Sequence, residues 1–467
     1  MNTQDWIKRG VSKLRAKPKN IEKLANVSAM PSPVAIENVV FEAPKKPRST
    51  GERLSARISK SEEALSPRVL RRTLGELHAI VDPRVSEVEG GRRAMGVAAW
   101  YAQATPAQRR DCWLLMSEQF MADPKKTKAA QDQYALAVGT PDEAVAQVRL
   151  RQSTVSPRRR LLQRFSVFPA GIRFLVDLRA DMLPALKTDK RLQALDVEME
   201  YMFSTWFDVG FLELKRISWD SPASMLEKLI QYEAVHDIKS WADLKNRLDS
   251  DRRCYGFFHP RLPDEPLIFV EVALLDAISD CITPLLDESA AAVDLRRATT
   301  AIFYSISNTQ SGLKGVSFGD SLIKRVVETL KEDFPRLKTF ATLSPIPGYR
   351  VWLQRSNSAL AAQAGQTDVL TLSEKSPLRK ALHQGAAQYL GSQWHAGKPL
   401  DAVARFHLGN GARIERIHWA GDPSGKGIKQ SYGLMVNYLY DLKKLDKHRD
   451  MLANGKIPMA SEVEKLV

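Results

Sequence analysis

Residues 304–320 of this chain read YSISNTQSGLKGVSFGD, and residues 339–349 read TFATLSPIPGY. The β-branched and aromatic residues of 301–307 predict a buried strand. Gly312, Gly315 and Gly319 follow, and the apolar residues of 321–333 recur on one helical face. A second strand is predicted over 338–343. The unit is therefore a strand, a glycine-rich loop, a helix and a strand.

This order of elements favours an anion site. Glycines allow a ligand close to the backbone, and the N–H groups at a helix start attract anions. In open α/β sheets, ligands bind beyond the carboxyl ends of the strands, so an anion on the loop would lie beside Ser344. The pattern also fits a tight strand-to-helix turn that binds nothing, because three close glycines are a weak motif.

The composition is that of a globular protein with more than one domain. The 467 residues are 44% hydrophobic and 26% charged. No apolar run approaches the roughly 18 residues that span a membrane, and no secretory signal pattern opens the chain. The three cysteines, Cys112, Cys254 and Cys281, are far apart, which favours free thiols in a reducing compartment. We expect a cytoplasmic protein with no metal site.

The net charge of +15 has two interpretations. One is nucleic-acid binding, and the other is attraction of polyanionic small molecules. No basic strand studded with aromatic residues and no zinc-finger spacing supports the first. Residues 1–60 are basic and broken by prolines, which predicts a flexible tail. The nearly acid-free residues 1–19 would also suit an organelle transit peptide.

Residues 61–205 predict a helical bundle. Apolar residues recur there at intervals of three and four, and prolines stand near the predicted helix starts. The run Arg158-Arg159-Arg160 is expected on a solvated helix face. The predicted helices are 64–79, 85–104, 106–121, 140–150, 157–165, 168–182 and 192–207.

From residue 206 to residue 467 the pattern changes to mixed strands and helices. A buried strand is predicted over 267–275. Asn410-Gly411 between apolar flanks is a turn signal, which would put His407 near a strand end and make 413–419 the returning strand. A lone histidine of this kind is more often a structural residue than a catalytic one.

Several segments together resemble the malonyl-CoA decarboxylase family. The resemblance covers about residues 60–445 and is densest over 215–350. It implies a C-terminal α/β catalytic domain of the acyltransferase-like (GNAT) type with a central mixed sheet. The matching segments are IxWxSPA (217–223), DRRC (251–254), EPLI (265–268), SxTQxGLxGV (307–316), LIKRVV (322–327), LSPIPG (343–348) and RFHLxNGA (405–412).

The resemblance implies a set of site residues. Ser344 and His407 match the family's catalytic serine and histidine, and Tyr440 matches a tyrosine near that histidine. The loop is expected to hold the pyrophosphate of coenzyme A. Ser317 replaces an acidic residue that the family often has, so a carboxylate role there is in doubt. The expected loop contacts are Lys314, Gly315, Val316, Ser317, Phe318, Gly319 and Asp320.

The implied reaction converts malonyl-CoA to acetyl-CoA and CO2, in fatty-acid and malonate metabolism. Coenzyme A is part of substrate and product, and no separate cofactor is expected. A homo-oligomer, dimer or tetramer, is expected through the helical domain, with neither nucleic acid nor membrane as partner. An acyl-CoA N-acyltransferase on the same scaffold and a basic nucleic-acid-binding scaffold protein stay open. The last residues, Lys465-Leu466-Val467, differ from the peroxisomal Ser-Lys-Leu address.

Overall fold

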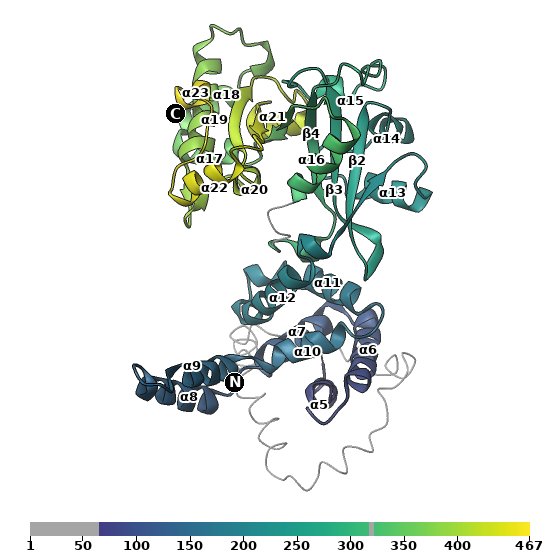
Figure 1. Ribbon diagram of the computed structural model, residues 1–467, viewed down its shortest axis with the longest axis vertical. Helices are drawn as coiled ribbons and strands as arrows, with labels where there is room; N and C mark the ends of the chain where they lie inside the picture. Colours follow the sequence, from purple (N-terminus) through teal and green to yellow (C-terminus); the bar gives the residue numbers. More distant parts are fainter. Residues whose placement is uncertain (1–64, 317–321) are drawn as a thin grey trace, which may run out of the picture. The chain divides into compact units, whose positions relative to one another are not determined.

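The computed structural model describes residues 65–316 and 322–467, and their packing forms two compact units (Figure 1). The first unit contains the chain up to Thr205 together with the short segment Ser311–Val316. The second contains Trp206–Gln310 and the chain after Val316. The expected tail over 1–60 lies outside the described residues. Among the residues described, no helix is both long enough and apolar enough to cross a bilayer.

The first unit is helical between residues 65 and 205, as the periodicity predicts. Two of its helices, α5 and α10, begin at a capping serine: the Ser66 and Ser156 side chains accept backbone N–H bonds at starts that carry proline. The helix α8 was not predicted. The bounds are α5 Pro67–Val81, α6 Glu87–Gln103, α7 Pro106–Glu118, α8 Pro124–Ala137, α9 Glu143–Thr154, α10 Pro157–Phe165, α11 Gly171–Met182 and α12 Gln193–Trp206.

The expectation of a solvated arginine face on α10 is wrong for Arg158. This side chain is only 4% exposed. Its guanidinium donates to the carbonyl oxygens of Met116 at 3.1 Å, Ala194 at 3.2 Å, and Ser117. The buried guanidinium therefore has three backbone acceptors, and these three carbonyl oxygens have a hydrogen-bond donor in Arg158.

The second unit is built on an eight-stranded mixed sheet. The strand order is β1-β2-β3-β4-β5-β10-β6, with β9 also paired to β10. Among the described strands of this sheet, β4 and β5 pair in parallel and all other neighbours pair antiparallel. The strands are β1 Glu213–Ile217, β2 Arg252–His259, β3 Leu262–Leu275, β4 Thr300–Asn308, β5 Thr339–Thr342, β6 Ser344–Pro345, β9 Arg413–His418 and β10 Met435–Leu439, and a separate two-stranded sheet holds β7 Trp394–His395 and β8 Lys398–Pro399.

Helices of the second unit precede and follow these strands (Figure 1). Asn357 ends α17, and its side chain caps the start of α18. The helices are α13 Ala223–Tyr232, α14 Trp241–Arg247, α15 Thr283–Leu286, α16 Leu322–Asp333, α17 Tyr349–Ser356, α18 Ser358–Gly365, α19 Pro377–Ser392, α20 Ala402–Gly409, α21 Gly425–Ser431, α22 Leu445–Ala453 and α23 Ser461–Glu464.

The strand–helix–strand unit predicted around the glycine loop is confirmed. Strands β4 and β5 pair in parallel, with Ile302 opposite Ala341. The apolar face of α16 is buried through Leu322, Ile323, Val326, Val327 and Leu330. A parallel pair needs a crossover connection, and α16 supplies it. The strand β5 therefore lies inside the sheet, between β4 and β10. Its carboxyl end is two residues before Ser344.

A buried carboxyl group lies inside the sheet at Glu271 on β3. It is 1% exposed, and Arg247 of α14 approaches it to 3.2 Å. Arg247 also pairs with Asp243 at 2.8 Å, so the positive charge of Arg247 is shared between Glu271 and Asp243. Burial, together with the nearby Glu233 carboxylate, raises the pKa of Glu271 to about 8 in spite of Arg247. Glu271 therefore holds a proton at neutral pH.

We predict that Glu271 makes the protein less stable as the pH rises. Its folded pKa of about 8 lies above the unfolded value of 4.5, so the folded state binds the proton more tightly. The free energy of unfolding should fall as the pH rises from 4.5 through about 8. Glu271→Gln should match the wild-type protein near pH 5 and exceed its Tm near pH 9. Equal pH slopes of Tm for the two proteins, measured by calorimetry, would contradict this assignment.

Candidate active site

Ser344 lies at the start of β6, where it pairs with Val436 of β10. The side chain is 5% exposed, and Pro345 follows it in the same two-residue strand. Its Oγ lies 2.8 Å from Oγ1 of Thr342, the last residue of β5. Thr342 Oγ1 also accepts the backbone N–H of Tyr438 at 3.1 Å. The hydroxyl of Ser344 is thus tied to two neighbouring strands.

His407 lies in the helix α20, so the expectation that it stands near a strand end is wrong. Asp401 caps this helix by accepting the N–H groups of Val403 and Ala404, each at 2.9 Å. Asn410-Gly411 ends the helix, with Gly411 at a φ of 86°, and does not form a hairpin turn. The predicted returning strand does follow, as β9.

The structure brings the three predicted catalytic side chains together. His407 Nε2 lies 3.3 Å from Ser344 Oγ, and its Nδ1 lies 2.7 Å from the Tyr440 hydroxyl. Tyr440 directly follows β10. The ring of Tyr438 stacks on the imidazole, with centroids 4.7 Å apart and planes at 25°. Both ring nitrogens therefore have a hydroxyl partner, and the stacked tyrosine fixes the plane of the ring.

Burial determines which groups carry protons. It lowers the pKa of His407 to about 3, so the imidazole is neutral, and it raises the pKa of Tyr440 far above its usual range. We assign the Tyr440 hydroxyl as the donor to Nδ1, which places the single ring proton on Nε2, facing Ser344 Oγ. Ser344 donates in turn to Thr342. The hydrogen bonds then form a line in which Tyr440, His407 and Ser344 donate in turn and Thr342 accepts.

Sequence reasoning missed Thr342, Tyr438 and Asn437 as supporting residues. Asn437 is fully buried and donates to the backbone oxygen of Thr342 at 2.7 Å. A signal existed in the two-residue period of strands: Thr342 lies two positions before Ser344, and Tyr438 two before Tyr440. That period predicts a shared face, but it cannot show which face meets the histidine.

The described part of the predicted coenzyme A loop ends at Val316. Lys314, Gly315 and Val316 lie within it, whereas Ser317, Phe318, Gly319 and Asp320 lie outside the described residues. Gly315 has a φ of 84°, a conformation that favours glycine. A Cβ on Gly312 would lie 1.9 Å from the carbonyl oxygen of Val176 on α11. The positive φ at Gly315 and the close packing at Gly312 therefore explain both glycines without a ligand.

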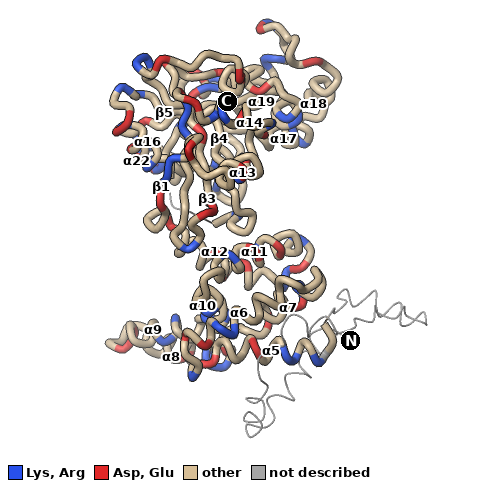
Figure 2. Tube along the Cα trace, turned by 90° about the vertical axis from the view of Figure 1, so that its right-hand side faces the viewer, with Lys and Arg blue, Asp and Glu red and all other residues tan. Residues whose placement is uncertain are grey.

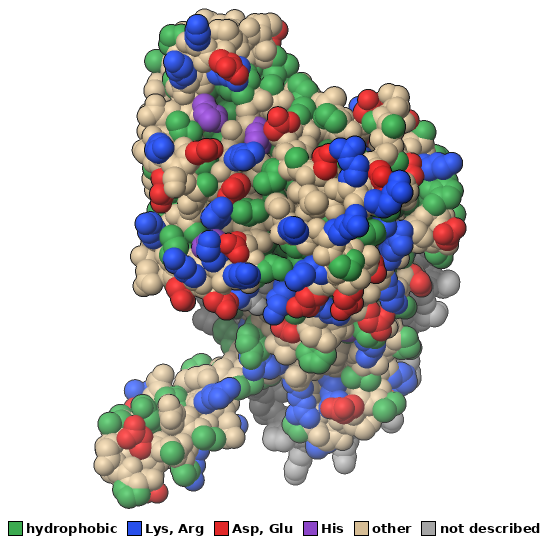
Figure 3. All heavy atoms as spheres, turned by 45° about the horizontal axis from the view of Figure 1, so that its top comes forward, with side chains coloured by type: hydrophobic (Ala, Val, Ile, Leu, Met, Phe, Trp, Pro, Cys, Tyr) green, Lys and Arg blue, Asp and Glu red, His purple; other side chains and the backbone are tan. Residues whose placement is uncertain are grey.

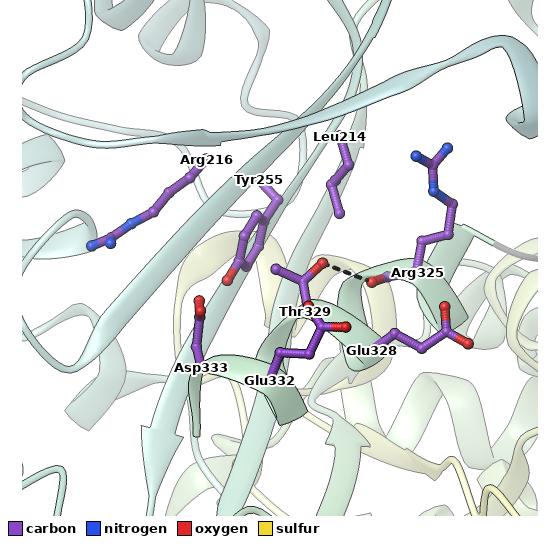
Figure 4. Close-up of a pocket in the computed structure, with 8 residues that line it drawn as sticks. All are labelled: Leu214, Arg216, Tyr255, Arg325, Glu328, Thr329, Glu332 and Asp333. Carbon is purple, nitrogen blue, oxygen red and sulfur yellow. Dashed lines mark hydrogen bonds between the residues drawn. The ribbon is translucent and has the colours of Figure 1, made fainter. Parts of the chain in front are cut away.

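One cavity of the second unit, about 350 Å³, contains none of the predicted site residues (Figure 4). Its carboxylates would repel a phosphate-bearing ligand. One of its two guanidinium groups, that of Arg325, is engaged with the carbonyl oxygens of Val209 and Leu212. Figure 4 shows the Tyr255 hydroxyl turned toward Asp333. The lining residues are Leu214, Arg216, Tyr255, Arg325, Glu328, Thr329, Glu332 and Asp333.

No cluster of three or more His, Cys, Asp or Glu side chains suited to hold a metal ion occurs in residues 65–316 and 322–467. The three cysteines are free, with Cys112 and Cys254 buried. The groups at the candidate site are hydroxyls and an imidazole, which bind carboxylates and move protons.

Family comparisons cover most of the chain. The malonyl-CoA decarboxylase C-terminal domain matches residues 210–467, and the malonyl-CoA decarboxylase N-terminal domain matches residues 120–207. Mitochondrial malonyl-CoA decarboxylase of Anser anser anser is 39% identical over 354 residues, 68% of this chain and 70% of that protein. The Mus musculus mitochondrial enzyme is 38% identical over 354 residues, 68% of this chain and 72% of that protein.

Solved structures are similar over a larger share of the chain. The crystal structure of malonyl-CoA decarboxylase from Rhodopseudomonas palustris has a TM-score of 0.76 and 40% identity, covering 85% of this chain and 99% of that one. The enzyme from Cupriavidus metallidurans has a TM-score of 0.68 and 41% identity, covering 86% of this chain and 100% of that one.

We predict that His407 stays neutral, with its proton on Nε2, from about pH 5 to pH 8. Burial lowers its pKa to about 3, and Tyr440 occupies Nδ1 as a donor. The ¹⁵N chemical shifts of histidine-labelled protein report both the charge and the tautomer of the ring. Tyr440→Phe removes the donor and should move part of the proton to Nδ1. Titration of His407 near 6.5, the ordinary histidine value, would contradict the assignment.

Proposed function

The chain belongs to the malonyl-CoA decarboxylase family, and we propose that it turns malonyl-CoA into acetyl-CoA and CO2 with Ser344, His407 and Tyr440 as catalytic side chains. As a member of that family, the protein is a carboxy-lyase. One observation carries the assignment of these residues: the imidazole lies 2.7 Å from one hydroxyl and 3.3 Å from the other.

The reaction breaks one carbon–carbon bond and forms one carbon–hydrogen bond. The electron pair of the bond to the carboxylate moves into the thioester, which becomes an enolate as CO2 leaves. A proton added to the enolate carbon then gives acetyl-CoA. The thioester is itself the electron sink, so the residues of the site have three tasks: to orient the carboxylate, to stabilise the enolate oxygen and to deliver a proton.

Ser344 suits the first task. When substrate binds, its hydroxyl proton can turn from Thr342 Oγ1, 2.8 Å away, to the malonyl carboxylate, and the Thr342 hydroxyl can then donate to Ser344 Oγ. The strand β6 and the rigid φ of Pro345 limit its movement. A hydrogen bond to a carboxylate is stronger where water is excluded, and Ser344 is only 5% exposed.

His407 and Tyr440 suit proton delivery. The proton on Nε2 faces Ser344, where the malonyl group would lie, and moves to the enolate carbon. A neutral imidazole that loses this proton would become an anion, which burial disfavours. Transfer of the Tyr440 proton to Nδ1 at 2.7 Å keeps the ring neutral and places the charge on the phenol oxygen, because a phenol is a stronger acid than the N–H of a neutral imidazole. Solvent then returns one proton to Nε2, and the Nδ1 proton moves back to the Tyr440 oxygen, so the protons balance and the resting tautomer is restored.

The pyrophosphate of coenzyme A is proposed to bind the glycine segment, of which Lys314, Gly315 and Val316 are described. Backbone N–H groups and a lysine side chain are suitable partners for phosphate oxygens. This assignment is supported by the match of residues 307–316 to the family pattern.

A homo-oligomer formed through the helical unit is also proposed. Apolar side chains on the neighbouring helices α8 and α9 support it, because they are strongly exposed: Leu136 by 84%, Val138 by 56% and Val148 by 54%. In residues 65–316 and 322–467, no comparable surface favours nucleic-acid binding. Figure 2 shows Lys and Arg interleaved with Asp and Glu along both units, and Figure 3 shows the same mixture on the face that it presents.

We predict that His407→Ala lowers turnover by about 10² to 10⁴ fold, the usual loss for a general acid. The assay contains malonyl-CoA and no acceptor, with release of CO2 and acetyl-CoA measured. His448→Ala is the matched control, because His448 is also buried but binds only the carbonyl oxygen of Gly411. An N-acyltransferase would form no CO2 without an amine, and a nucleic-acid binder would leave malonyl-CoA intact. Near-normal turnover by folded His407→Ala would refute the role of the imidazole.

We predict that Ser344 acts without forming an acyl-enzyme. Ser344→Ala should lower kcat by about 10² fold through loss of the carboxylate contact, while acetyl-CoA still binds in calorimetry. Mass spectrometry of the wild-type protein during turnover should find neither a malonyl nor an acetyl adduct. Ser431→Ala, at a buried serine that donates to the carbonyl oxygen of Leu434, is the control for stability. A kinetically competent adduct on Ser344 would instead support an acyl-transfer path.

A further inference from the structure

We propose that Arg179 of the helical unit is a positioning residue for coenzyme A, because it orients the peptide groups of the glycine segment Ser311–Val316. The inference rests on the proposed function, in which this segment binds the pyrophosphate. Arg179 and Ser311–Val316 belong to the same compact unit, although about 130 residues separate them in the sequence.

Arg179 is one of the most deeply buried side chains of the protein, at 1% exposure on α11. Its Nη1 donates to two carbonyl oxygens of the segment, that of Gly312 at 2.8 Å and that of Lys314 at 2.9 Å. Its Nε donates to Asp196 at 2.8 Å, and its Nη2 lies 3.6 Å from Glu200. The two carboxylates on α12 therefore hold the guanidinium, and the guanidinium holds the segment.

The orientation of two peptide planes follows from these contacts. The C=O and N–H of a trans peptide point in opposite directions. With the carbonyl groups of Gly312 and Lys314 turned to Arg179, the N–H groups of Leu313 and Gly315 point away from it. Peptide N–H groups are common hydrogen-bond donors to phosphate oxygens. Arg179 thereby fixes two such groups through their partner carbonyls.

The close packing of the segment on α11 explains Gly312. A Cβ there would lie 1.9 Å from the carbonyl oxygen of Val176, so a side chain would push the segment away from Arg179. Gly315 needs its own freedom, with a φ of 84°, to continue the chain after the second bound carbonyl. The packing of Gly312 on Val176 and the hydrogen bonds of Arg179 thus together determine the backbone conformation of the segment.

Arginine is required here by geometry. Its planar fork offers five N–H donors in fixed directions, enough for two carbonyl groups and two carboxylates at once. Lysine keeps the charge but has one nitrogen on a flexible stem, so it cannot serve acceptors on opposite sides. Arg179→Lys therefore tests orientation while the buried positive charge stays in place.

The experiment compares two substrates in Arg179→Lys and in wild-type protein. Malonyl-CoA carries the pyrophosphate and nucleotide, whereas malonyl-pantetheine lacks both. We expect the KM for malonyl-CoA to rise about tenfold or more, with kcat and the KM for malonyl-pantetheine changed less than about threefold. Gly312→Ala should produce the same selective change by a different route. Gly96→Ala is its control, since a Cβ at Gly96 meets nothing within 4 Å.

Arg158→Lys is the matched arginine control. Arg158 is also buried in the helical unit and donates to three backbone carbonyls, but it does not contact Ser311–Val316. The substitution Arg158→Lys should lower the Tm and leave the KM values for malonyl-CoA and malonyl-pantetheine unchanged. If Arg179→Lys raises both KM values equally, or neither, Arg179 is only a structural residue and the inference fails. If the wild-type protein decarboxylates neither substrate, the proposed function itself fails.

Discussion

The His407 imidazole lies buried between the hydroxyl groups of Tyr440 and Ser344, and the organisation of the site depends on that placement. A buried nitrogen without a partner would cost about 1–3 kcal/mol, so each ring nitrogen needs its hydroxyl. Meeting both needs at once requires α20, β6 and the end of β10 to converge. The sheet order, with β10 between β5 and β6, makes this convergence possible.

The same burial determines the direction in which protons can move. In water a histidine exchanges its proton on either nitrogen, and its charge changes near neutral pH. Here burial suppresses the charged form, and Tyr440 and Ser344 distinguish the two nitrogens. The site thus resembles a fixed line of donors more than a titrating group. The ring of Tyr438 stacks on the imidazole and fixes its plane. The hydroxyl of Thr342 ends the line by accepting the hydrogen bond of Ser344.

The sequence predicted the parts whose signal is local. The β4–α16–β5 unit could be found because the apolar period changes from strand to helix within it. The pair Asn410-Gly411 favours a hairpin and so wrongly predicts a strand near His407, whereas Asp401 is a helix-capping signal that agrees with α20. The burial of Arg158 and the role of Arg179 were beyond reach, because the carbonyl groups that they bind come from distant residues. The sequence around a charged side chain does not indicate which distant carbonyl groups it will bind.

The glycine segment has a consequence for dividing the protein into parts. The family's two domain patterns meet between residues 207 and 210, which suggests a natural cut there. Yet Ser311–Val316, far beyond that point, packs as part of the helical unit. A fragment starting after residue 207 would carry this segment without Val176 and Arg179, its packing surface and its anchor. The linear boundary of the domains is therefore not the boundary of the compact units, and exchanging helical regions between relatives would have to preserve the fit at Gly312.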